Sequence, residues 1–265
     1  MVSILGIPLD ENSSFLRGPA LAPRKIMACL HSDSSNLATE SGFDLGTSKD
    51  WQDVGDLELA TGAQAIIQIE TGVQKLLERG DKVLCLGGDH SVSYPIVRAH
   101  GAKFGALNIL HLDAHPDLYD NMLNNKFSHA SPFARMLENG LVKRLVQVGI
   151  RTLNPHQREQ AKRFGVEIIE MRDLSKLESL EFAQPFYLSL DLDVLDPAFA
   201  PGISHHEPGG LTTRELLNIL HNIKTSLVGA DLVEYNPTRD LQDMTGMVAA
   251  KLCKELIEKL VRSIP

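Results

Sequence analysis

Short apolar runs rich in valine, isoleucine and leucine alternate along the chain with longer segments of helical periodicity. The runs predict strands at Ser3–Leu9, Lys82–Leu86, Leu107–Leu112, Leu145–Ile150, Val166–Glu170, Phe186–Leu192 and Leu227–Val233. Nearly continuous apolar strands are typical of a parallel sheet that is covered by helices on both faces. The alternation therefore predicts an α/β fold with a mainly parallel sheet, as a single domain over residues 1–265.

The segments between these runs carry helix signals. One apolar stripe in Ala63–Glu78 is formed by Ile66, Ile69, Val73, Leu76 and Leu77. Thr212 and Glu215 have the spacing of a capping box ahead of another apolar stripe, and a last helix is predicted from about Met244 to Arg262. Ser32–Asp50 lacks periodicity and is expected to be an extended loop before the Trp51–Leu57 segment.

Composition and charge narrow the class of protein. Hydrophobic residues make up 43% and charged residues 23%, which is ordinary for a globular chain and excludes disordered, fibrous and membrane-embedded classes. The 26 basic and 34 acidic residues give a net charge of −8, and basic residues occur in pairs at most. We therefore expect no nucleic-acid partner and no membrane partner.

The cysteines argue against a secreted protein. Cys29, Cys85 and Cys253 form no CxxC motif, and an odd number does not suit a disulfide framework. The first residues also lack the charged region of a signal peptide. From these features we expect a cytoplasmic location.

Polar residues follow the predicted strands where a parallel α/β sheet binds its ligands, outside the carboxyl ends. Four runs end in this way, in Gly87-Gly88-Asp89-His90, Asp113-Ala114-His115-Pro116-Asp117, Asp191-Leu192-Asp193 and Glu234. Side chains of an extended chain alternate, so the first, third and fifth positions of Asp-x-His-x-Asp point the same way. Two imidazoles and four carboxylates are thus predicted to converge.

Carboxylates gathered this closely repel one another, so the cluster calls for cations, and two divalent metal ions bridged by shared carboxylates would satisfy it. Taken singly, His90 or any one of these aspartates is more often a structural or capping residue. The joint pattern outweighs that interpretation, because buried carboxylates without partners are costly. Oxygen ligands with some imidazole favour Mn²⁺ or a related ion, while Zn²⁺, Co²⁺ and Fe²⁺ stay open.

Longer motifs resemble a known family. They are Gly87-Gly88-Asp89-His90-Ser91, Asp113-Ala114-His115-Pro116-Asp117, Ser128-His129-Ala130-Ser131-Pro132-Phe133 and Asp191-Leu192-Asp193-Val194-Leu195-Asp196-Pro197. These are similar to the signatures of the ureohydrolases, the arginase and agmatinase family, and the similarity covers nearly the whole chain. Asn12-Ser13-Ser14-Phe15 and Glu234-Tyr235-Asn236-Pro237 are placed as in plant-type arginases. The resemblance implies a three-layer α/β sandwich.

The resemblance also implies a ligand set and an assembly. One metal ion would be bound by His90, Asp113, Asp117 and Asp191, and the other by His115, Asp113, Asp191 and Asp193. Asp113 and Asp191 would be the bridges between two Mn²⁺ ions. A homo-oligomer, a trimer or hexamer, is the assembly that the family suggests.

The implied reaction is hydrolysis of a guanidino group to urea and an amine. A water held between two metal ions loses its proton near neutral pH and can attack the guanidinium carbon. Glu234 is suited to pair with the planar cation. The family assigns proton transfer to Asp117, and His129, with an unperturbed pKa near 6.5, is the expected second proton carrier.

The substrate is less sharply defined. The Ser-x-Asn pair with which animal arginases hold the amino-acid head is missing from Asn125-Lys126-Phe127-Ser128-His129, and Asn154 replaces an acidic loop residue. The Ser204–Gly210 loop follows plant-type arginases and favours L-arginine, with agmatine and guanidino acids such as guanidinobutyrate as alternatives. A single-metal deacetylase of related fold and a metal-binding regulatory protein without catalysis are the other candidates.

Overall fold

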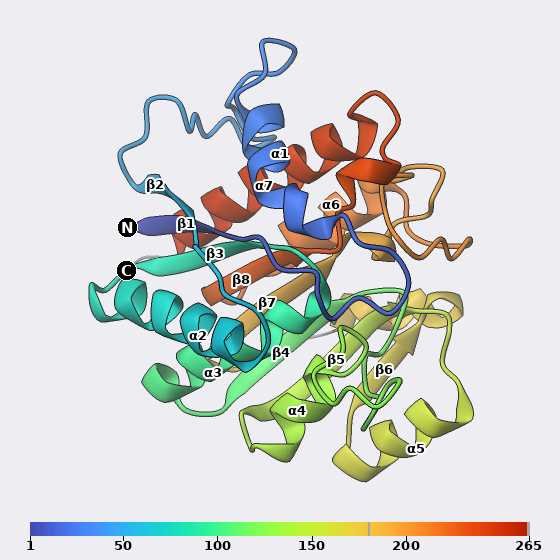
Figure 1. The fold of residues 1–265 in the computed structure, drawn as a ribbon. Coiled ribbons are helices and arrows are strands. Elements are labelled where there is room, and N and C mark those ends of the chain that lie inside the picture. The colour runs from blue at the N-terminus through green and yellow to red at the C-terminus, as the bar shows by residue number, and fades with distance from the viewer. Residues whose placement is uncertain (180, 264–265) are drawn as a thin grey trace.

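One parallel sheet runs through the middle of the molecule in the computed structural model, which describes residues 1–179 and 181–263 (Figure 1). Its eight strands, all paired in parallel, lie in the order β2-β1-β3-β8-β7-β4-β5-β6. The bounds are β1 Val2–Ile7, β2 Trp51–Asp56, β3 Lys82–Gly87, β4 Leu107–Leu112, β5 Val142–Ile150, β6 Glu167–Glu170, β7 Phe186–Asp191 and β8 Leu227–Val233. Residues 180, 264 and 265 of the predicted domain lie outside the described residues.

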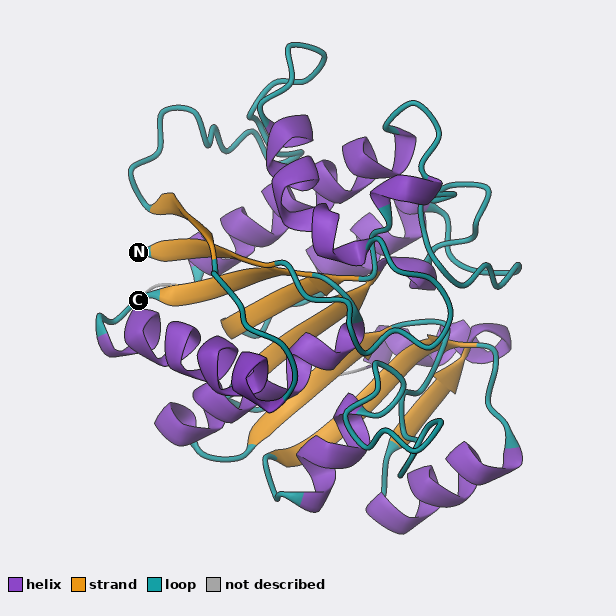
Figure 2. Ribbon diagram, viewed as in Figure 1, coloured by secondary structure: helices purple, strands orange, loops and turns teal. Residues whose placement is uncertain are grey.

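Helices cover both faces of the sheet (Figure 2). One face carries α1 (Ala22–Leu30), α6 (Thr213–Asn222) and α7 (Met244–Arg262), and the other carries α2 (Ala63–Glu78), α3 (Ser93–Phe104), α4 (Pro132–Glu138) and α5 (Pro155–Phe164). Each set packs its apolar side chains against one face of the strands, which gives two separate hydrophobic clusters. The three-layer α/β sandwich expected from the resemblance is confirmed.

The sequence located most elements closely. The bounds of α2, β4 and α7 agree with the prediction, and the capping box of Thr212 and Glu215 begins α6. The Trp51 segment forms the edge strand β2, and β5 begins at Val142 rather than Leu145 because it pairs with β4 from Leu107 onward. The three cysteines are free and buried. No helix in the described part of the chain is long and apolar enough to cross a membrane.

The sheet order decides where the polar ends of the strands meet. The strands β3, β8, β7 and β4 are neighbours at the centre of the sheet. In the pairs β3–β8 and β7–β4, the two strands are adjacent in the sheet but not consecutive along the chain. The strands are parallel, so their carboxyl ends lie at one edge of the sheet. The four polar segments singled out in the sequence are therefore brought together at that edge.

Candidate metal centre

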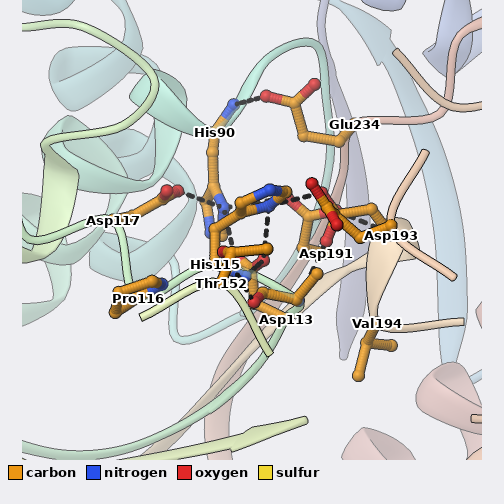
Figure 3. Close-up of polar contacts among 12 residues, drawn as sticks. His90, Asp113, His115, Pro116, Asp117, Thr152, Asp191, Asp193, Val194 and Glu234 are labelled. Atoms are coloured by element: carbon orange, nitrogen blue, oxygen red, sulfur yellow. Dashed lines mark hydrogen bonds and ion pairs between the residues drawn. The ribbon is translucent and has the colours of Figure 1, made fainter. Parts of the chain in front are cut away.

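All six predicted metal ligands meet at the carboxyl edge of the central strands (Figure 3). His90 follows β3 in a single 3₁₀ turn, and the loop after β4 carries Asp113, His115 and Asp117. Asp191 ends β7, and Asp193 lies in the turn that follows. His115 is the most exposed of the six, and the other five are buried.

His90 lies at the centre of one half of the cluster. Its Nδ1 is 3.0 Å from Asp191 Oδ2, 3.1 Å from Asp117 Oδ2 and 3.2 Å from Asp113 Oδ2. This nitrogen is fully buried, and none of the three contacts has the geometry of a hydrogen bond. The four atoms therefore face a common point rather than pair with one another.

His115 organises the other half. Its Nδ1 is 2.9 Å from Asp193 Oδ2 and 3.5 Å from Asp113 Oδ1. The two oxygens of Asp113 thus face different halves of the cluster. Asp191 Oδ1 accepts the backbone N–H of Asp193 at 2.7 Å, and Asp191 Oδ2 faces His90 Nδ1.

The spacing of these atoms fits a metal ion. Ligands at about 2.1 Å from an ion, in neighbouring positions of an octahedron, lie about 3.0 Å apart. The separations of 2.9–3.2 Å around His90 and between His115 and Asp193 match this spacing, and the 3.5 Å between His115 Nδ1 and Asp113 Oδ1 is longer. The donor set of carboxylate oxygens and imidazole nitrogens suits divalent ions. Two compact groups, His90 with His111 and Asp113, and Asp113 with His115 and Asp193, give the cluster the form of a binuclear site.

The electrostatics of the cluster also call for cations. Burial raises the pKa of Asp193 to about 6, with Asp113 adding repulsion, and burial raises the pKa of Asp191 well above its usual range. These carboxyl groups are costly to ionise in this setting without a positive partner. A pair of divalent ions would supply that charge.

His129 and Glu234 face the cluster from its open side. His129 Nδ1 is 2.8 Å from Glu234 Oε1, and its Nε2 is 2.8 Å from Ser14 Oγ. Burial alone would lower the pKa of His129, but Glu234 raises it to about 9. The pKa of Glu234 is held below its usual value, because the charge of His129 outweighs burial. The sequence predicted both residues at the site but not their pairing.

A cavity of about 190 Å³ opens above the cluster. Its walls are Ser14, His115, Asp117, Tyr119, Met122, His129, Ala130, Thr152, Gln157, Asp191, Asp193, His205, Glu207 and Glu234. Metal-site carboxylates, the His129–Glu234 pair and hydroxyl groups thus share one space. A small polar molecule in the cavity would contact all three.

Local backbone geometry supports this arrangement. Asp117 and Glu234 adopt positive φ angles of 48° and 65°, which are uncommon for residues with a side chain and concentrate at functional sites. A Cβ atom at Gly88 would lie 1.8 Å from the backbone oxygen of Leu9, so only glycine fits beside His90. The close approach of the first loop lets Asn12 and Ser13 hydrogen-bond to Asp89.

The structure adds residues that the sequence did not single out. His205 stacks on His129 with ring centroids 5.3 Å apart, and His111 Nε2 lies 2.7 Å from Asp113 Oδ2, which can only accept. His111 lies near the end of β4, two positions before Asp113, which follows that strand, so the alternation that selected the aspartate also pointed to His111. Asn154 caps α5 through Gln157 and hydrogen-bonds to Tyr119, which gives it a structural role at the cavity rim.

The sheet and the cluster together define an α/β protein with a candidate binuclear metal centre at the carboxyl edge of its strands. Residues 1–258 match the model of the arginase family. The chain belongs to this family.

Individual relatives agree. The chain is 51% identical to "Arginase 1, mitochondrial" of Arabidopsis thaliana, over 97% of this chain and 80% of that protein. The structure of the arginase from Medicago truncatula superimposes with a TM-score of 0.94 at 46% identity and covers 98% of this chain and 87% of that one. An agmatinase of Bacillus anthracis is more distant, at 35% identity over 97% of this chain and 90% of its own length.

Proposed function

We propose that the protein is an arginase, which hydrolyses L-arginine to L-ornithine and urea at a centre of two Mn²⁺ ions. The observation that carries this proposal is the shared cavity, where the His/Asp cluster, Glu234 and His129 face one space. The floor of the cavity suits an activated water, and its wall suits a planar cation. Identity of about half to plant arginases supports the choice of substrate.

The metal ligands are proposed as the sequence suggested. His90, Asp113, Asp117 and Asp191 hold one ion, and His115, Asp113, Asp191 and Asp193 hold the other. A bound pair of divalent ions lowers the pKa of water to near neutrality and so supplies the nucleophile for hydrolysis. The preference for Mn²⁺ rests on the mainly oxygen ligands.

Glu234 binds and orients the guanidinium group. Its Oε1 already accepts the backbone N–H of His90 and faces His129, so Oε2 is the oxygen available to the substrate. A buried carboxylate beside a donor-only planar cation forms strong charge-assisted hydrogen bonds. These bonds hold the central carbon toward the floor of the cavity.

Proton transfer falls to two residues. The leaving amine needs a proton when the carbon–nitrogen bond breaks, and His129, with a pKa of about 9, is charged at neutral pH. Its Nε2 is 2.8 Å from Ser14 Oγ, and both residues line the cavity. Asp117 lies at the floor within the cavity lining and can receive a proton there.

Agmatine is the second candidate, and one feature of the cavity favours it. Its described lining contains no lysine or arginine to pair with the α-carboxylate of arginine, which agmatine lacks. Glu207, also in the lining, suits the ammonium group that both molecules carry. Hydroxyl groups of Ser14, Tyr119 and Thr152 and the imidazole of His205 are among the groups in the lining that could bind the carboxylate of arginine. Guanidino acids would use the same groups.

The test is urea release by purified protein loaded with Mn²⁺. L-arginine, agmatine and guanidinobutyrate are compared by kcat/KM, with metal-stripped protein as the control. At least a tenfold preference for L-arginine is expected, together with loss of urea on metal removal. A preference for agmatine replaces the substrate, and binding of two ions without urea from any guanidine contradicts hydrolysis and favours a metal-binding regulatory protein.

Assembly and compartment remain predictions. A trimer or hexamer is expected, and the mass of the protein in solution tests it. The cytoplasmic location inferred from the sequence has no support from the plant relatives, several of which are named as mitochondrial.

A further inference from the structure

A row of polar side chains crosses the sheet directly beneath the metal cluster. Strand register places Gln147, His111, Ser189 and Asp231 side by side on β5, β4, β7 and β8. All four side chains are fully buried, in strands that are otherwise almost entirely apolar. Buried polar groups in such strands are costly unless they are paired.

The hydrogen bonds of Gln147 determine which ring nitrogen of His111 carries the proton. Gln147 Nε2 lies 2.6 Å from the carbonyl oxygen of Pro116 and 3.0 Å from His111 Nδ1. A carbonyl only accepts, so the atom facing it must be the amide nitrogen, and that nitrogen also donates to His111 Nδ1. The proton of His111 is therefore on Nε2, where it is donated to Asp113 Oδ2 at 2.7 Å.

The other end of the row fixes His90 in the same way. Ser189 donates its hydroxyl proton to Asp231 Oδ1 at 2.7 Å, and Tyr187 donates to Asp231 Oδ2 at 2.8 Å. Ser189 Oγ then accepts from His90 Nε2 at 3.0 Å. The proton of His90 is thus on Nε2, and the Nδ1 lone pair points into the cluster.

We propose that this row, Gln147, His111, Ser189 and Asp231, positions the metal ligands Asp113 and His90 and thereby sets the affinity of the centre for metal. His111 is a hydrogen-bond donor to a ligand and not itself a ligand, although it lies close enough to His90 and Asp113 to be counted with them. Its ring stacks on Phe133 with centroids 3.9 Å apart, which holds it in the plane that this donation needs.

The inference rests on the metal centre of the proposed function and is independent of the substrate. Groups that hydrogen-bond to metal ligands typically change metal affinity by about 10–100-fold when they are removed. His111→Phe keeps a flat ring beside Phe133 but removes the donor. His111→Gln places an amide N–H near the position of Nε2, so it keeps the donor but is a poor metal ligand.

The experiment measures Mn²⁺ binding directly, from the electron paramagnetic resonance signal of free Mn²⁺ titrated with metal-stripped protein. His111→Phe and Ser189→Ala are expected to weaken binding about 10–100-fold, Gln147→Met by a smaller factor, and His111→Gln by about threefold or less. The matched control is Asn108→Leu. Asn108 is a buried amide on the same strand that donates to backbone carbonyls at the opposite edge of the sheet. The Asn108→Leu protein should bind Mn²⁺ with the affinity of the unaltered protein.

Thermal unfolding of the metal-stripped variants separates positioning from folding. His111→Phe and Asn108→Leu should both lower the melting temperature, while only the former lowers affinity. Affinity unchanged in His111→Phe and Gln147→Met overturns the proposal. Loss of one ion in His111→Gln, to the extent seen in His111→Phe, also overturns it, because His111 would then be a ligand. Two ions bound tightly without urea release would contradict the proposed function alone.

Discussion

The substitution Glu234→Gln tests how the cavity recognises a guanidinium group. The change keeps the shape of the side chain and removes its charge. The backbone N–H of His90 lies 2.9 Å from Oε1 and requires an acceptor there. The glutamine must therefore place its oxygen toward His90, which leaves its NH₂ group at the position of Oε2. A guanidinium only donates, so two sets of donors would face each other.

The expected loss follows from these contacts. A hydrogen bond to a charged group contributes about 1.5–3 kcal/mol, and the opposed N–H groups add to that loss. A total of about 3 kcal/mol corresponds to a fall in kcat/KM of about 100-fold. Because Glu234 is not among the proposed metal ligands, the variant should still bind two Mn²⁺ ions.

The assay is urea release at several concentrations of L-arginine, with metal content measured on the same samples. Glu255→Gln is the matched control. Glu255 is also a buried glutamate, but it lies on α7, where it pairs with Lys251 and His221. Its kcat/KM should stay within twofold. A Glu234→Gln protein that holds two ions and retains kcat/KM within threefold would refute the proposed role.

Three further predictions concern single groups. Asp193→Ala should lose one of two tightly bound Mn²⁺ ions, measured by metal analysis after gel filtration, because Asp193 Oδ2 faces His115; two ions with full urea release would argue against it. Glu234 raises the pKa of His129 from 6.5 to about 9, so the pair stabilises the metal-free fold. This stabilisation is complete below pH 6.5 and is lost as the pH rises through about 9. Between pH 6 and 10 the unaltered protein should lose roughly 3 kcal/mol of unfolding free energy relative to His129→Asn in urea titrations, and parallel curves would contradict this. Asn154→Ala removes the cap of α5 and should cost about 1 kcal/mol, or roughly 2–4 °C in melting temperature, whereas Asn154→Asp keeps the cap and should not.

The sequence predicted elements well where the pattern was long or continuous. The strand β4 and the helices α2 and α7 were located with their bounds, because the apolar positions in these segments are the ones that become buried. Short elements were harder. The helix α4 has only seven residues, too few for a helical stripe, and the first part of β5 is partly exposed, so its residues do not form an apolar run.

The candidate site was predictable as a set of residues but not as a geometry. Alternation along an extended segment predicted that Asp113, His115 and Asp117 lie together, and the family motif added His129 and Glu234. The three residues do meet, but they lie in the loop after β4, where Asp117 has a positive φ, so strand alternation was the wrong reason for their convergence. The contact between His129 and Glu234 joins residues 105 positions apart, on different segments of the chain. Only the order and register of the strands determine such a distance, and neither is encoded in local periodicity.

The polar row beneath the cluster has its own signal in the sequence, which is a polar residue inside an otherwise apolar strand. Strands buried on both faces should be apolar throughout, so each polar position within one requires a partner. His111 and Ser189 stand two residues before Asp113 and Asp191, and the period of a strand therefore puts them on the side of the ligands, one step deeper in the sheet. Two polar residues that each stand two positions before a predicted ligand are expected if they hold those ligands in place, and are not expected from packing alone. In a parallel sheet, the strand register that brings the ligands together at the carboxyl ends also brings together the residues two positions earlier. The ligand cluster and the polar row beneath it are therefore set by the same pairing of the strands.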